Sequence, residues 1–396
     1  MNFLLEKVEN QYLNEFDLTL LNQKQIILFK NEHNQISSKK KEIDKEHIIK
    51  YWDKMKKIGN PYELVYTTYN KKRKNDSISD YTPISRSYFK LWEIFNNYDI
   101  FKYTKNKLKI NCAHLAEGPG GFMEASINYL NQLGKKNSSF WGLTLKPNDQ
   151  YVPDWNKIKK FCKERKNCFI EYGDLYEYED VLSFVFKLSN YKMDLVTADG
   201  GFDYSQDFNG QELNSCQILY SEIVVGLNIL NKNGSFVIKF FDLFSITSIQ
   251  LIHLLNYHFE EVYIYKPETS RQANSEKYIV CLYFKDNLNY DYKEKLLLNI
   301  KKWSDLIKTK KNDEYIIINN FRYNNNLIRS VNNINKKYIL NQVNYINFIL
   351  NMIEKKLLKD EYHDILKKQV LKAIEWCKKY NIPINKNSIY YQKNNF

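Results

Sequence analysis

The chain has 396 residues, which is enough to bury a complete hydrophobic core and predicts one large domain with a smaller addition. Its formal net charge of +13 is compatible with a polyanionic partner, but lysine and asparagine are abundant throughout, so charge alone does not establish nucleic-acid binding. The six scattered cysteines include no Cys-x-x-Cys pair, and no run of about 18 apolar residues occurs, which argues against a disulfide framework, a zinc site and a transmembrane helix.

Residues 1–80 are polar and rich in lysine, and we interpret them as an N-terminal extension. The first residues lack the apolar core of a signal peptide, which together with the unpaired cysteines indicates a reducing, intracellular compartment. A charged helix is expected over residues 37–57, and Asn60-Pro61 breaks it. The basic run 71–74 lies in a loop, where a phosphate contact and a solvated surface segment explain it equally well.

Strands and helices alternate regularly over residues 81–287. Helices are expected at 85–97, 122–133, 180–188, 212–230 and 246–257, and strands at 110–115, 139–145, 168–172, 193–198, 235–241, 261–265 and 277–284. This alternation implies right-handed crossovers and a mostly parallel α/β sheet with helices on both faces. The last two strands are separated only by a loop, so they predict an antiparallel hairpin at one edge.

After about residue 288 the pattern changes to a C-terminal helical region that extends to residue 396. Helices are expected at 293–306, 338–358 and 361–380, and the asparagine-rich stretches near Asn319 and Asn332 are interpreted as loops. We therefore expect three parts, namely an extension over 1–80, an α/β domain over 81–287 and a helical region over 288–396.

A glycine-rich turn joins the first strand of the α/β domain to its helix. Glycine lets the backbone approach a ligand closely, and the N-terminus of the following helix favours a negative group. The turn does not follow Gly-x-Gly-x-x-Gly, which weakens the case for a dinucleotide. Its residues are Ala116, Glu117, Gly118, Pro119, Gly120, Gly121 and Phe122.

Charged side chains stand at the ends of several expected strands, where ligands bind in doubly wound sheets. Asp174 follows the third strand and either accepts a hydrogen bond from a ligand or caps a helix. Asp199 and Lys239 end neighbouring strands. Lysine at such a position is usually a snorkelling side chain, but a partly buried lysine beside other cations can have a lowered pKa and accept a proton. Lys90 would supply the second cation.

Five segments together resemble the FtsJ-like ribose 2′-O-methyltransferases, and most closely their messenger-RNA cap branch. These segments span residues 116–122, 142–146, 197–202, 239–244 and 266–276, so the resemblance covers roughly residues 85–285. It implies a Rossmann-like methyltransferase sheet with an antiparallel last strand. The chain departs from bacterial ribosomal-RNA members in its long extensions, and it has Thr144 and Lys146 where an acid would end the second strand.

The resemblance also assigns roles to individual residues. The family's Lys-Asp-Lys-Glu catalytic tetrad falls on Lys90, Asp199, Lys239 and Glu276. Binding of the cofactor S-adenosyl-L-methionine falls on the turn 116–122 and on Asp174, Leu175 and Asp199. Substrate contacts fall on Arg86, Gln211, Glu212 and Asn274. Independently of the resemblance, Tyr151 and Trp155 lie in an expected loop where they could stack on a base, but aromatic residues are 15% of the chain and most of them must be core or surface residues. No metal is required.

The function implied by the resemblance is methyl transfer to the ribose 2′-OH of a cap-proximal nucleotide of mRNA. Lys239 would accept or steer the hydroxyl proton, with a pKa lowered by Lys90. The alternatives are a 2′-O-methyltransferase of ribosomal or transfer RNA, and an inactive RNA-binding subunit of a capping complex. Capped mRNA is the expected partner, with capping or transcription enzymes as further candidates and no membrane. The expected location is the nucleus for a cellular protein, and the host cytoplasm or virion for a large DNA virus.

Overall fold

The computed structural model of the protein describes residues 1–7, 20–24, 26–67, 76–146, 153, 155–163, 167–201, 209–309, 311, 314–318, 324–356 and 358–393. Its central element is an eight-stranded sheet in the order β1-β8-β9-β7-β6-β3-β4-β5. The strands are Asn2–Leu4 (β1), Asn111–Leu115 (β3), Ser139–Thr144 (β4), Cys168–Tyr172 (β5), Met193–Ala198 (β6), Leu230–Phe240 (β7), Phe259–Tyr265 (β8) and Lys277–Phe284 (β9). A separate ribbon pairs β2 (Leu20–Lys24) with β10 (Glu314–Ile318).

The central strands β7, β6, β3, β4 and β5 are parallel, and β8 and β9 form an antiparallel hairpin, as the sequence predicts. The expected Rossmann-like α/β sheet is therefore confirmed. One detail of the expectation is wrong, because the hairpin is not the edge of the sheet. The short strand β1 pairs antiparallel with β8 and lies outside it. A strand of three residues that pairs with a segment far along the chain shows no recognisable pattern in its own sequence.

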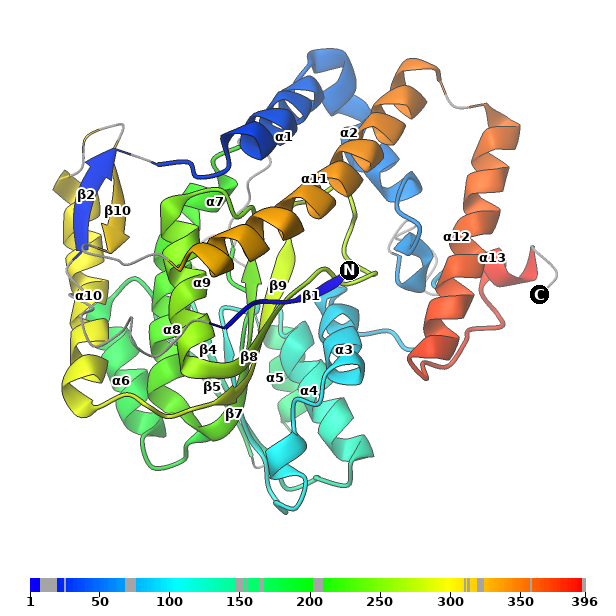
Figure 1. Ribbon diagram of the computed structural model, residues 1–396. Helices are drawn as coiled ribbons and strands as arrows, with labels where there is room; N and C mark the ends of the chain where they lie inside the picture. The colour runs from blue at the N-terminus through cyan, green and yellow to red at the C-terminus, as the bar shows by residue number, and fades with distance from the viewer. Residues whose placement is uncertain are drawn as a thin grey trace.

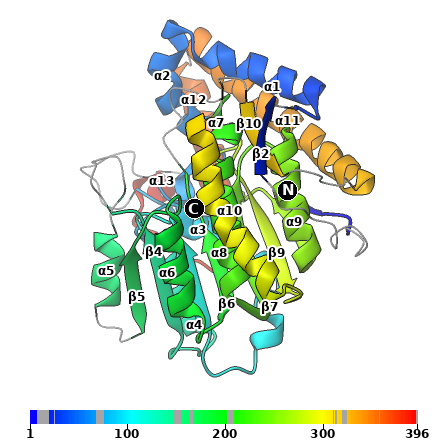
Figure 2. The ribbon, with the colours of Figure 1, turned by 90° about the vertical axis from the view of Figure 1, so that its left-hand side faces the viewer.

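Helices cover both faces of this sheet (Figures 1 and 2). The α3, α4 and α5 helices share one hydrophobic core with one face, and α6, α8, α9 and α10 share the other. The helices are α1 (Lys30–Ile43), α2 (Glu46–Ile58), α3 (Ser87–Asn97), α4 (Gly121–Gln132), α5 (Asn156–Cys162), α6 (Tyr178–Leu188), α7 (Gln211–Asn214), α8 (Cys216–Ile229), α9 (Ile246–His258), α10 (Tyr290–Thr309), α11 (Asn325–Glu354), α12 (Lys359–Lys379) and α13 (Ile389–Gln392).

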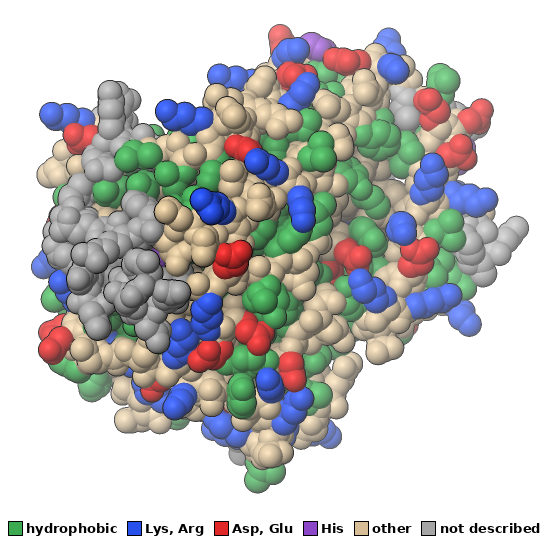
Figure 3. Space-filling model, viewed as in Figure 1, with side chains coloured by type: hydrophobic (Ala, Val, Ile, Leu, Met, Phe, Trp, Pro, Cys, Tyr) green, Lys and Arg blue, Asp and Glu red, His purple; other side chains and the backbone are tan. Residues whose placement is uncertain are grey.

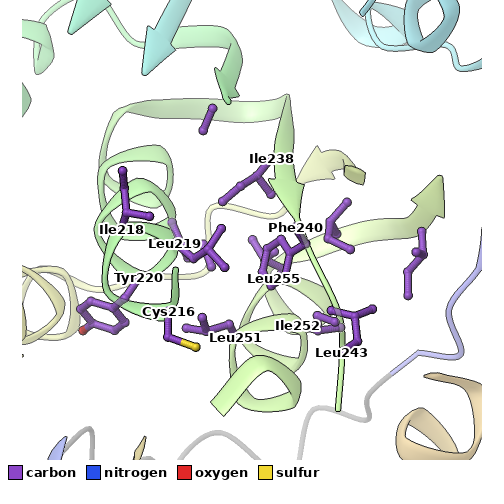
Figure 4. Close-up of a cluster of buried hydrophobic side chains, with 14 of the residues drawn as sticks. Cys216, Ile218, Leu219, Tyr220, Ile238, Phe240, Leu243, Leu251, Ile252 and Leu255 are labelled. Atoms are coloured by element: carbon purple, nitrogen blue, oxygen red, sulfur yellow. The ribbon is translucent and has the colours of Figure 1, made fainter. Parts of the chain in front are cut away.

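Buried apolar side chains pack between β7 and the α8 and α9 helices near the middle of the sheet. Figure 4 shows Ile238 and Phe240 of β7 directed toward Leu219 of α8 and Leu255 of α9, all of which are buried. Alternate residues of a strand point to opposite faces. Lys239 therefore faces the other side of the sheet, where α3 lies, and its strand is fixed in place by the apolar neighbours on either side of it.

Several helix boundaries differ from the expected ones. The single helix expected over 212–230 is divided into α7 and α8, and the one expected over 37–57 into α1 and α2. The asparagine-rich stretch near Asn332 is not a loop but part of α11. This helix begins at Asn325 because the side chain of Asn324 accepts hydrogen bonds from the backbone N–H groups of Asn326 and Leu327, at 2.9 and 3.0 Å. The stretch near Asn319 lies outside the described residues.

The two terminal regions are packed together at one end of the sheet. The helices α1 and α2 contact α11, and both ribbon views show these N-terminal and C-terminal helices side by side. The buried ion pair between Lys40 of α1 and Asp242, at 2.6 Å, places α1 over the carboxyl end of β7. The extensions thus lie at the edge of the sheet where ligands bind in this class of fold.

The charged surface is mixed in sign on the face shown in Figure 3. Lysine and arginine side chains are spread over this face with acidic side chains between them, and they do not gather into one basic patch. In the described part of the chain, no helix is both long enough and apolar enough to cross a membrane.

Candidate active site

The four residues of the expected tetrad lie on one face of the sheet, at the carboxyl ends of its central strands. Val237 of β7 and Val280 of β9 belong to the core on the α3 side, so Lys239 and Glu276 point to that side by the two-residue alternation. Asp199 directly follows β6, the parallel neighbour of β7. Lys90 is on α3, which covers this face. The topology thus brings together four residues that are far apart in the sequence.

The tetrad forms two ion pairs that share one neighbourhood. The Nζ of Lys90 lies 2.6 Å from a carboxylate oxygen of Glu276, and the Nζ of Lys239 lies 3.3 Å from Oδ1 of Asp199. Lys239 also donates a hydrogen bond of 2.6 Å to the backbone carbonyl of Asp199. All four side chains are between 12% and 16% exposed, so they line a surface that a substrate can reach.

Tyr278 connects the two ion pairs and was not expected from the sequence. Its hydroxyl group lies 2.9 Å from Oδ1 of Asp199 and 3.3 Å from Oε1 of Glu276. It stands opposite Lys239 in the β7–β9 register and two residues after Glu276, on the same face of the sheet. The spacing of Glu276 and Tyr278 on one strand was the available signal, but tyrosine is too common in this chain for that spacing to stand out.

Two glycines follow Asp199, and the second, Gly201, makes room for Lys239. A Cβ atom at Gly201 would lie 3.0 Å from the Nζ of Lys239, and one at Gly200 would lie 2.3 Å from a carboxylate oxygen of Glu222. Glu222 is a buried acid on α8 that accepts a hydrogen bond of 3.1 Å from the backbone N–H of Gly200. The glycine pair therefore allows a cation and a buried carboxylate to approach the strand end closely.

The charge balance of the site corrects one expectation. Burial opposes the charged form of Lys239, but Asp199, Glu276 and Glu222 outweigh it and raise the pKa of this lysine. From the sequence, the pKa of Lys239 was expected to be lowered by Lys90. In the structure Lys90 is neutralised by Glu276, and burial of Glu276 is outweighed by Lys90 and Lys239, which hold the pKa of Glu276 well below its usual range. The arrangement favours the ammonium form of Lys239.

The glycine-rich turn lies between β3 and α4, at the same end of the sheet. Ala116 and Gly120 have left-handed backbone angles, with φ of 51° and 105°. Other parts of the protein pack closely against two glycines of the turn. A Cβ atom at Gly118 would lie 2.6 Å from Pro153, and one at Gly120 would lie 2.6 Å from Ile158. Glu117 and Phe122 are buried, and the carboxylate of Glu117 accepts a hydrogen bond from Thr197 under the turn.

The neighbouring strand ends offer unequal support for a cofactor. Asp174 follows β5, and its Oδ1 accepts a hydrogen bond of 2.9 Å from the backbone N–H of Tyr176, which leaves Oδ2 as a further acceptor. Leu175 is buried in the core. At the end of β4, Thr144 is buried and Lys146 is exposed, so this position has no acid.

The four expected substrate residues divide into two kinds. Gln211 and Asn274 line a cavity next to Glu276. Arg86 instead donates hydrogen bonds to the backbone carbonyls of Thr269 and Tyr66, at 2.9 Å each. Glu212 is buried and accepts hydrogen bonds from the backbone N–H groups of Phe244 and Ser245, directly before α9. Arg86 and Glu212 thus hold the protein's own loops, and their direct contact with a substrate stays a prediction.

One expectation for the aromatic residues is corrected. Trp155 is 1% exposed and packs against Gly142 in the core beneath the turn, so it is not available to stack on a base. Tyr151 and the basic run 71–74 lie outside the described residues.

Two lysines alternating with two carboxylates at the carboxyl end of a doubly wound sheet, beside a strand–turn–helix connection, define a candidate group-transfer site. The chain belongs to the FtsJ-like methyltransferase family, whose model matches residues 83–284, about half of the chain. All four tetrad residues fall within this match.

Similar proteins include cap-specific mRNA (nucleoside-2′-O-)-methyltransferases. The chain is 29% identical over 246 residues to methyltransferase 2 of Drosophila melanogaster, which covers 58% of this chain and 33% of the relative. It is 37% identical over 204 residues to methyltransferase 1 of Mus musculus, over 48% of this chain and 23% of that protein. The chain thus spans a third or less of the length of these relatives. A solved Plasmodium falciparum structure described as a ribosomal RNA methyltransferase has a TM-score of 0.38 and 19% identity, over 50% of this chain and 97% of that chain.

Proposed function

We propose that this protein transfers a methyl group from S-adenosyl-L-methionine to the ribose 2′-OH of a cap-proximal nucleotide of mRNA. The main support for the proposal is that Lys90, Asp199, Lys239 and Glu276 lie together at the carboxyl ends of the central strands. The names of the relatives support the cap-proximal substrate, because both describe cap-specific 2′-O-methyltransferases. Capped mRNA is accordingly the proposed partner.

The residues at the strand ends fit the cofactor at both of its ends. The first N–H groups of α4 have no acceptor within the helix and suit the carboxylate of the methionine part. The free oxygen of Asp174 suits the amino group of the adenine part. When bound there, S-adenosyl-L-methionine supplies an electrophilic methyl group on a positively charged sulfur.

The tetrad would prepare the acceptor hydroxyl for attack. A ribose hydroxyl is a poor nucleophile near neutral pH, so its proton must leave as the new carbon–oxygen bond forms. The site favours the ammonium form of Lys239, so this side chain must first release a proton to solvent. Its neutral amine would then accept the proton of the hydroxyl, while Asp199 fixes the position of Lys239. Lys90 and Glu276 would hold the ribose through their remaining donor and acceptor positions. Much of the acceleration would come from alignment of the two substrates.

Replacement of Lys239 by Met tests the proposal. It keeps most of the side-chain volume and removes the amine, so methyl transfer from radiolabelled S-adenosyl-L-methionine to a capped transcript should fall by about 100-fold or more. Lys232→Met changes an exposed lysine on the same strand and should retain activity. Equal methyl transfer by the two variants would refute the role of Lys239.

The substrate class is tested with transcripts of one sequence that do or do not carry a 5′ cap. We expect 2′-O-methylation only of the capped transcript, detected by nuclease digestion and mass spectrometry of the products. Methylation of ribosomal or transfer RNA in preference to the capped transcript would replace the proposed substrate and retain the reaction.

A further inference from the structure

A cavity of about 130 Å³ opens next to the tetrad, and Glu276 forms part of its wall. Four of its residues, Lys40, Ile43, Trp52 and Lys56, come from α1 and α2, and Gln342 comes from α11. These helices lie outside the residues matched by the family model. The cavity is thus built by both terminal extensions against the catalytic part of the chain.

The wall of this cavity combines flat apolar surface with free polar groups. Trp52 and Phe241 contribute aromatic rings, and both residues are largely buried, at 4% and 6% exposed. A cavity of about 150 Å³ holds one benzene ring, so this space accommodates a single planar group that extends toward its opening. Aromatic walls of this kind stack on nucleobases.

The polar side of the cavity can recognise the edge of such a group. Among the described residues, the side-chain amide of Asn274 has no hydrogen-bond partner. Gln211 accepts a hydrogen bond of 2.6 Å from Ser275, which leaves its amide nitrogen as a donor. The amide of Asn274 therefore offers the cavity a donor and an acceptor, and the amide of Gln211 offers one further donor. Nucleobases present matching donors and acceptors along their edges.

The two lysines of the cavity differ in how firmly they are paired. Lys40 forms a buried ion pair with Asp242 at 2.6 Å, so its charge is already balanced within the protein. Lys56 is paired with Asp53 at 2.5 Å, but the side chain of Asp53 is 85% exposed. Exposed pairs of this kind contribute about 1 kcal/mol or less, so a phosphate can replace Asp53 as the partner of Lys56.

We propose that this cavity binds a nucleobase of the RNA within one nucleotide of the methyl-accepting ribose, with Lys56 contacting the adjoining phosphate. The position of the ribose depends on the proposed function, because Glu276 belongs to both the tetrad and the cavity wall. The base stacks against Trp52 and Phe241, and Asn274 contacts its edge. The N-terminal and C-terminal extensions therefore contribute substrate-binding residues above the carboxyl ends of the central strands.

Fluorescence anisotropy with a short labelled, capped oligoribonucleotide tests this inference without requiring methyl transfer. Trp52→Leu should weaken binding by about 5- to 150-fold, the range found for loss of one stacked base. Lys56→Met should reduce the slope of log Kobs against log salt by about 0.7, as expected for one lost phosphate contact on a single strand. Lys50→Met changes an exposed lysine on the same helix and should leave the slope unchanged.

The position of the bound base is found by removing one base at a time. Three probes lack the cap guanine, the base of the acceptor nucleotide or the base after it. The Trp52→Leu effect should disappear with one of these probes, since that probe has no base to stack. A loss of affinity that persists with all three probes, or unchanged binding and salt slope in both the Trp52 and the Lys56 variant, would overturn the inference. If the Trp52 variant does not fold, the salt slopes of Lys56→Met and Lys50→Met decide the question.

The outcome is separable from that of the proposed function. If the wild-type protein methylates capped RNA but the variants bind like wild type, only the cavity is wrongly assigned. If the wild-type protein transfers no methyl group, the proposed function fails whatever the anisotropy shows.

Discussion

Tyr278 is the residue that joins the two halves of the candidate active site. Its hydroxyl group has a single proton but lies within hydrogen-bond distance of both Asp199 and Glu276. Burial, followed by the charges of these two carboxylates, raises the pKa of Tyr278 well above its usual range, so the phenol remains a neutral donor. It separates the two negative charges while each carboxylate stays paired with its own lysine.

Replacement of Tyr278 by Phe is therefore expected to lower activity without unfolding the protein. Loss of one hydrogen bond to a charged group costs about 1.5–3 kcal/mol, which corresponds to a decrease in kcat of about 10- to 150-fold if the alignment of the tetrad depends on it. Steady-state kinetics and a melting curve check the result. Tyr283→Phe, on the same strand but hydrogen-bonded to Asp99, is the matched control. Unchanged kcat in the Tyr278 variant would show that the bridge is dispensable.

At the scale of elements, Glu93 connects α3 to the loop 266–276 between β8 and β9 and to the C-terminal helix α12. It lies three residues after Lys90 and is fully buried. Its carboxylate accepts hydrogen bonds from the backbone N–H of Glu268 at 2.7 Å and of Thr269 at 2.8 Å. The indole N–H of Trp376 on α12 donates another, at 2.9 Å. The segment that carries Asn274 and Glu276 is thereby fixed to the helix that carries Lys90.

Glu93→Gln should reduce stability and activity together. The Gln side chain has an NH₂ group where Glu93 has a carboxylate oxygen, and this group cannot accept a hydrogen bond. At least one buried N–H donor would lose its partner, which lowers the free energy of unfolding by about 1–3 kcal/mol. Denaturant unfolding measures this loss, and kcat should fall because Glu276 moves relative to Lys90. Glu375→Gln, at an exposed position on α12, should stay within about 0.5 kcal/mol of wild type. Wild-type stability in the Glu93 variant would contradict the proposed link.

The elements themselves were largely predictable where local pattern decides them. The β3, β6 and β9 strands lie close to their expected bounds because each is a short segment rich in apolar residues between turns. The breaks between α1 and α2 and between α7 and α8 were not predicted from the sequence. The pairing of β1 with β8 and of β2 with β10 was also missed, because each joins segments that lie far apart in the sequence.

For the whole molecule, two buried histidines predict acid sensitivity. Burial lowers the pKa of both His253 and His258 from 6.5 to about 4. Between these values the unfolded chain binds more protons than the folded one, so folding stability rises with pH from about 4 to about 6.5. We expect the free energy of unfolding, measured by urea titration, to fall as pH decreases through this window. The double variant His253→Gln/His258→Gln should depend less steeply on pH, and an identical slope would show that other groups control the acid response.

The sequence by itself determined the alternating α/β pattern, through local periodicity, and indicated the tetrad, through the segments that resemble the FtsJ-like family. Only the tertiary structure decided how the charges balance. It raised rather than lowered the pKa of Lys239, placed Tyr278 between the carboxylates and turned Arg86 and Glu212 toward the backbone. It also brought both extensions over the strand edge to form the cavity. The physical reason is that pKa values, burial and cavities depend on neighbours that are distant in the chain, and no local pattern specifies them.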